Sequence, residues 1–96
     1  MEFLELIPES VSKRVTYENL VAGQTLFLEN DPAQAFFVLE SGQIKLLHYT
    51  KSGQTIQHYR IEAGESFAEV TLFNDNYLYT AIAESPSRVV IFPKQP

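Results

Sequence analysis

Three glycines recur at a regular interval in the middle of the sequence. Gly42, Gly53 and Gly64 lie eleven residues apart, and each closes a run of residues with β-strand character. Short strands that are separated at a regular spacing by turn residues favour a barrel, a sandwich or a roll over a fold that alternates strands with helices. The sequence therefore predicts an all-β fold.

The remaining segments agree with this fold class. The segment 35–39 is apolar throughout, so we expect a strand whose two faces are both covered. In the segment 55–61, alternation predicts that Gln57, Tyr59 and Ile61 share one face. The full set of predicted strands is 25–28, 35–39, 43–50, 55–61, 78–84 and 88–92, and a short helical turn is predicted at 10–15.

The stretch 64–81 departs from this strand pattern. After a glycine turn, Val70 and Phe73 lie three residues apart in a segment, 68–73, that fits one helical turn. The polar tip 74–76 follows it and leads into the next predicted strand. A helical turn between strands points unpaired backbone N–H groups at whatever lies before it, which suits an anion or a sugar oxygen.

Composition narrows the classes of function. The 96 residues suffice for one domain, 1–96, and the 45% hydrophobic content is that of a globular protein. Seven Lys and Arg against twelve Asp and Glu give a net charge of −5, which disfavours nucleic acid as a partner. The chain has no cysteine and no apolar run of membrane-spanning length, so we expect a cytoplasmic protein with no membrane partner.

Several segments, in order, resemble the cyclic nucleotide-binding domain, and in particular the sensor domain of the CRP/FNR transcription regulators. Segment 23–31 is similar to the family's opening glycine, apolar strand and acidic turn, and 35–42 to its apolar strand that ends in glycine. Residues 68–70 stand where the family's phosphate-binding cassette has Gly-Glu-Leu, and 79–81 where it has Arg-Ser/Thr-Ala. The resemblance covers nearly the whole chain from Val21 and implies a jelly-roll-like β-roll, or double-stranded β-helix.

The resemblance also implies roles for individual residues. Glu69 would bond the ribose hydroxyl, the backbone at 68–70 would face ribose and phosphate, and Thr80 would donate to a phosphate oxygen. The complete implied ligand set is Ala68, Glu69, Val70, Tyr79, Thr80 and Ala81. No cofactor is implied.

One position departs from the family pattern in a way that matters for the ligand. Tyr79 stands where the family has its phosphate-binding arginine, so a neutral hydroxyl group replaces a positively charged guanidinium group. With Glu69 retained and no cation beside it, we expect the chain to bind no standard cyclic nucleotide. The alternative role for Tyr79 is core packing beside Tyr77 and Phe73.

Two other positions leave alternatives open. The Glu69 carboxylate has a purely structural alternative, in which it caps the short helix or pairs with Arg60 or Arg88. His48 and His58 lie on neighbouring predicted strands, where two histidines can bind a metal or haem. Without a third ligand, a solvated or hydrogen-bonded pair is the favoured interpretation, so no metal site is predicted.

The sequence contains no nucleophile motif and no nucleotide-cradling glycine loop, so no enzymatic activity is predicted. The leading hypothesis is a domain that senses a small-molecule effector within a longer, homodimeric CRP/FNR-type regulator. DNA would then be bound only by a domain beyond Pro96. The alternative hypothesis is a degenerate domain that serves as a protein-interaction or dimerisation module without a small-molecule ligand.

Overall fold

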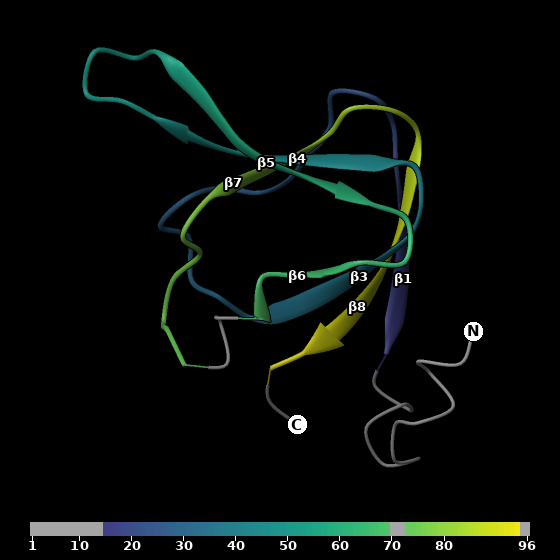
Figure 1. Ribbon diagram of the computed structural model, residues 1–96. Coiled ribbons are helices and arrows are strands. Elements are labelled where there is room, and N and C mark those ends of the chain that lie inside the picture. The colour runs from purple at the N-terminus through teal and green to yellow at the C-terminus, as the bar shows by residue number, and fades with distance from the viewer. Residues whose placement is uncertain (1–14, 70–72, 95–96) are drawn as a thin grey trace.

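The computed structural model describes residues 15–69 and 73–94 (Figure 1). The named secondary-structure elements in this part of the chain are all β-strands. The all-β prediction is therefore confirmed. The helical turn predicted at 10–15 lies outside the described residues except for Val15, which is not helical. The strands are β1 (Thr16–Leu20), β2 (Thr25–Phe27), β3 (Ala35–Ser41), β4 (Gln43–Tyr49), β5 (Thr55–Glu62), β6 (Ser66–Phe67), β7 (Thr80–Ala83) and β8 (Ser87–Pro93).

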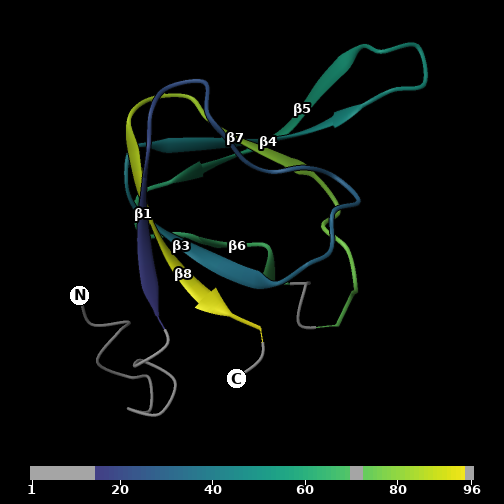
Figure 2. The same cartoon turned by 180° about the vertical axis from the view of Figure 1, so that it is seen from behind.

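The strands form two four-stranded sheets in which all pairs are antiparallel. One sheet has the order β1-β8-β3-β6 and the other the order β2-β7-β4-β5. Figures 1 and 2 show the two sheets facing each other, with the β4–β5 hairpin projecting beyond the rest of the molecule. This arrangement is consistent with the jelly-roll-like β-roll expected from the sequence.

The recurring glycines lie at the turns that connect β3, β4, β5 and β6. All three have positive φ, and Gly42 at 91° is the most constrained by its surroundings. A Cβ atom at Gly42 would overlap the Ser87 side chain and the backbone of Pro86, so both conformation and space require glycine there.

The main core lies between the two sheets, and β3 contributes to it from one face. Phe37 and Leu39 belong to this core, whereas Val38 points to the other face and packs with Val90 and Phe92 in a second, smaller cluster. Phe36 covers that cluster by stacking on Phe92 at a centroid distance of 4.8 Å. The prediction that both faces of 35–39 are covered is confirmed.

The prediction that Gln57, Tyr59 and Ile61 share one face of β5 is wrong for Gln57. The register pairs Leu46 with Tyr59 but Leu47 with Gln57, so β5 carries one extra residue between the two pairs. Such a bulge reverses the alternation of the strand. Gln57 therefore lies on the opposite face from Tyr59, whereas Tyr59 and Ile61 stay together.

The strand predicted at 78–84 is shorter than expected, because β7 begins at Thr80. The neighbouring strand β2, with which β7 pairs, ends at Phe27, and the chain then turns away. Residues before Thr80 therefore have no partner strand in β2. Before β7, the backbone of Tyr77 is hydrogen-bonded to the turn that follows β2. Asn30 N donates to Tyr77 O, and Tyr77 N donates to Asp31 O. No helix in the described part of the chain is long and apolar enough to cross a membrane.

Candidate functional site

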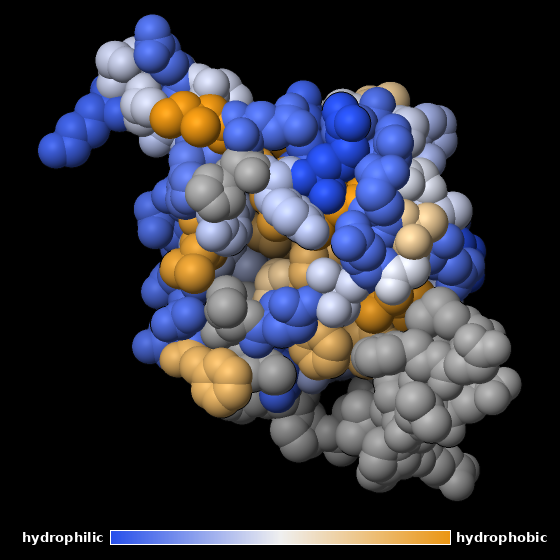
Figure 3. Space-filling model, in the orientation of Figure 1, coloured by the Kyte–Doolittle hydropathy of each residue, from blue (hydrophilic) through white to orange (hydrophobic). Residues whose placement is uncertain are grey.

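A cavity of about 290 Å³ lies beside the stretch 64–81, between the inner faces of the two sheets. Its floor is made of buried apolar and aromatic side chains, and more exposed residues surround its mouth. Figure 3 shows hydrophobic residues in the middle of this side of the molecule, bordered by hydrophilic ones. The lining residues are Phe27, Leu46, Tyr59, Ile61, Ser66, Phe67, Ala68, Glu69, Tyr77, Leu78 and Tyr79.

The start of the stretch is held to β3 by backbone hydrogen bonds. Gly64 N donates to Leu39 O at 2.7 Å, and Leu39 N donates to Glu65 O at 2.9 Å. The two residues of β6 then pair with β3, which directs Phe67 into the core. This attachment fixes the side of the cavity on which the next two residues lie.

Ala68 and Glu69 line the cavity directly after β6. Ala68 has a φ of 65°, a left-handed conformation that is strained for a residue with a Cβ atom. The Glu69 side chain is exposed, and its backbone lies in a 3₁₀ conformation. Half of the helical turn predicted at 68–73, Val70 included, lies outside the described residues.

Tyr79 lines the cavity from the other side and also packs against the core. Its ring lies 4.6 Å from the His48 ring, and His48 Nδ1 is 3.1 Å from Glu29 Oε2. The expected packing of Tyr79 beside Phe73 is not observed, because Phe73 is 89% exposed. The tyrosine side chain therefore separates the cavity from the His48 and Glu29 pair.

The structure does not bring Thr80 and Ala81 to the cavity. Both are almost completely buried in β7, with 1% and 0% exposure. The Thr80 hydroxyl oxygen accepts a hydrogen bond from Glu29 N at 3.0 Å, which ties β7 to the turn after β2. Of the residues expected in the site, Ala68, Glu69 and Tyr79 come together.

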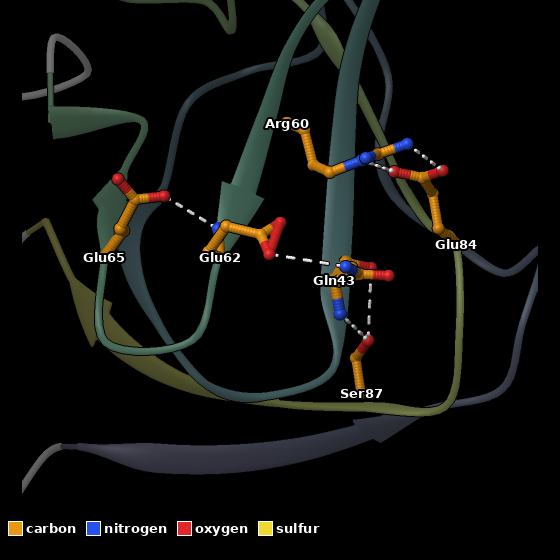
Figure 4. Close-up of polar contacts among 6 residues, drawn as sticks. All are labelled: Gln43, Arg60, Glu62, Glu65, Glu84 and Ser87. Atoms are coloured by element: carbon orange, nitrogen blue, oxygen red, sulfur yellow. Dashed lines mark hydrogen bonds and ion pairs between the residues drawn. The ribbon is translucent and has the colours of Figure 1, made fainter.

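The described arginines point away from the cavity and pair with other carboxylates. Figure 4 shows Arg60 reaching across to Glu84, with an Nε to Oε1 distance of 2.6 Å. This hydrogen bond lowers the pKa of Glu84 and raises the pKa of Arg60. Arg88 pairs with Glu40 at 3.1 Å, so neither arginine pairs with Glu69, as one structural alternative required.

His48 does not line the cavity either. It faces Ile56 in the β4–β5 register, and the side chain of His58 lies outside the described part of the structure. Within residues 15–69 and 73–94 there is no group of three His, Asp or Glu side chains that could hold a metal ion.

Sequence reasoning missed most of the cavity floor. Phe27, Leu46 and Ile61 come from three different strands and carry no local motif that marks a ligand site. The alternation of β5 was the only available signal, because it places Tyr59 and Ile61 on one face.

The chain matches the family model of the cyclic nucleotide-binding domain over residues 17–96. No curated protein matches its sequence significantly. Among solved structures, a candidate cAMP-binding regulatory protein from Silicibacter pomeroyi DSS-3 is 32% identical with a TM-score of 0.85, over 90% of this chain and 40% of that one.

Two further structures are informative. The sensor domain of the transcriptional regulator DNR from Pseudomonas aeruginosa is 28% identical with a TM-score of 0.85, over 98% of this chain and 75% of that one. The catabolite activator protein of Thermus thermophilus is 22% identical with a TM-score of 0.80, over 93% of this chain and 44% of that one, and shows the shared fold. The chain belongs to the cyclic nucleotide-binding domain family, in the form found in the sensor domains of CRP/FNR-type regulators.

Proposed function

We propose that this domain senses a small-molecule effector for a CRP/FNR-type transcription regulator and that the effector is not a standard cyclic nucleotide. The observation that supports this function most directly is the charge of the cavity lining. Of the described residues that line the cavity, Glu69 is the only Asp, Glu, Lys or Arg, and Tyr79 stands at the position of the family's arginine. A cyclic phosphate in this cavity would meet a carboxylate without a neighbouring cation.

The loss of affinity for a cyclic phosphate can be approximated from the energies of single hydrogen bonds. A hydrogen bond to a charged group contributes roughly 1.5–3 kcal/mol, and each 1.4 kcal/mol changes affinity about tenfold. Replacing an arginine contact by Tyr79 therefore weakens cyclic phosphate binding by about one to two orders of magnitude.

The proposed output belongs to a longer protein. The chain spans 40% of the Silicibacter protein and 44% of the catabolite activator protein, so DNA binding and homodimer formation are proposed only for a whole regulator. In that protein, an effector in the cavity would act by binding one conformation of the following segment more tightly than another.

Calorimetric titration with cyclic AMP and cyclic GMP tests this function. We expect dissociation constants weaker than about 100 µM for the natural chain and a gain of about tenfold or more for Tyr79→Arg. Tyr79→Phe is the matched control, because it keeps the ring without adding charge, and it should show no gain. Low-micromolar affinity of the natural chain for either nucleotide would contradict the proposal.

A dimerisation or interaction module without ligand is the second candidate function. It is supported by the projecting β4–β5 hairpin (Figure 2), on which Tyr49 and Ile56 are 49% and 51% exposed. A module of this kind would show no saturable binding of any small molecule in the cavity.

A further inference from the structure

The floor of the cavity is a continuous aromatic surface. Phe27 stacks on Tyr77 at a centroid distance of 3.9 Å and on Phe67 at 6.4 Å, and both contacts are close to parallel. Tyr59 and Tyr79 add two more rings from β5 and from the segment before β7. A floor of this kind binds a flat or apolar ligand body by burying its surface.

Cationic side chains are kept off this surface by strand alternation. Lys45 and Arg60 are paired across β4 and β5, and each is next in sequence to a cavity residue, Leu46 or Tyr59. Because neighbouring residues of a strand point to opposite faces, both cations lie on the outer face, where Arg60 binds Glu84. None of the described lysines or arginines lines the cavity.

The mouth of the cavity carries the opposite charge. Glu69 is exposed at the lining, and no described residue forms an ion pair with it. The Glu69 carboxylate attracts an ammonium group, and an aromatic ring of the lining adds to this attraction where its face is open to the cation. The same arrangement repels a ligand carboxylate or phosphate.

We infer that the cavity binds a small aromatic or apolar amine, with its ring against Phe27, Tyr59 and Tyr77 and its ammonium group at Glu69. This inference rests on the proposed effector-sensing function and specifies its ligand class. The volume of about 290 Å³ lies just below the range of about 300–1,000 Å³ for ligand pockets, so one ring system with a short side chain suits it.

Three indole compounds of similar size and different charge test the inference on the full chain. Tryptamine carries an ammonium group, indole-3-ethanol a neutral hydroxyl and indole-3-acetate a carboxylate. In calorimetric titrations at low salt, we expect tryptamine to bind about two- to fivefold more tightly than indole-3-ethanol, and indole-3-acetate to bind most weakly. The preference should shrink at 1 M salt, which screens an exposed charge.

Three variants locate the effect. Glu69→Gln should remove the preference for tryptamine and leave the affinity for indole-3-ethanol unchanged. Glu18→Gln removes the same charge from the exposed strand β1, outside the cavity, and should keep the preference. Ser66→Trp adds bulk to an exposed lining residue and should weaken binding of all three compounds, with thermal melting used to verify folding.

The possible failures are distinguishable. Equal binding of tryptamine and indole-3-acetate, or no binding of tryptamine up to millimolar concentration, would overturn the inferred ligand class and leave the proposed function standing. Tight binding of cyclic AMP or cyclic GMP would instead overturn the proposed function and, with it, the inference.

Discussion

At the scale of single residues, three positions of the stretch 64–81 differ in how they relate to the cavity. Ala68 adopts a left-handed φ of 65°, which glycine accepts without strain. Tyr79 lies between the cavity and the His48 and Glu29 pair. Thr80 is buried and bonded to Glu29 N, so its hydroxyl serves the turn and does not face the cavity.

The backbone at Ala68 gives a prediction for stability. Ala68→Gly should raise the free energy of unfolding by about 0.5–1 kcal/mol, because relief of the left-handed strain exceeds the larger conformational entropy of glycine in the unfolded chain. Urea denaturation measures the change. The matched control is Ala63→Gly, since Ala63 does not have a positive φ and the substitution there should destabilise. Equal effects at both positions would contradict the prediction.

At the scale of secondary-structure elements, turns and a bulge decide which faces meet. The bulge in β5 reverses its alternation, so that Tyr59 reaches the cavity while Gln57 does not. On the outer side, the hydrogen-bonded pair of Arg60 and Glu84 links β5 to the turn after β7. This exposed pair contributes little to stability, but its contribution depends on pH.

The lowered pKa of Glu84 sets the direction of that dependence. A carboxyl whose pKa is lower in the folded state stabilises the fold above its unfolded pKa, and this stabilisation disappears as the pH falls through the folded pKa. The raised pKa of Arg60 matters only at strongly alkaline pH. Between about pH 5 and about pH 3, Glu84→Gln should therefore lose less stability than the natural chain.

Thermal melting at several pH values measures this difference. Glu18→Gln removes an exposed carboxylate on β1 and is the control, which should follow the acid dependence of the natural chain. Identical acid dependence of Glu84→Gln and the natural chain would show that the ion pair has no measurable effect.

At the scale of the whole molecule, the two sheets are joined through one aromatic cluster. Phe27 comes from β2 in one sheet and stacks at 5.4 Å on Phe37 and at 6.4 Å on Phe67, which come from β3 and β6 in the other. The same cluster forms part of the cavity floor. The cohesion of the fold and the shape of the site therefore depend on the same side chains.

Truncation of this cluster should be costly. Phe27→Ala is expected to lower the free energy of unfolding by about 3–5 kcal/mol, because it removes buried contacts to both sheets and leaves a void. Such a loss is a large part of the total of about 5–15 kcal/mol for a domain. Tyr49→Ala, at a residue that is 49% exposed, should change stability by about 0.5 kcal/mol or less in the same urea titration. Comparable losses for the two variants would contradict this account of the core.

The sequence by itself determined the fold class and directed attention to one stretch of the chain. Glycines at a regular spacing and the apolar segment 35–39 predict short strands, because turn geometry and strand burial are local properties of the chain. The resemblance over 68–70 and 79–81 pointed to the region in which the cavity lies.

Only the tertiary structure decided which of these residues share a space. The bulge in β5, the burial of Thr80 and the floor around Phe27 depend on pairing between strands that are far apart in the sequence. Local patterns carry no information on such register, because a shift of one residue moves a side chain to the other face of the sheet. The charge of the cavity follows from the same pairing, which turns Lys45 and Arg60 outward and leaves Glu69 at the mouth.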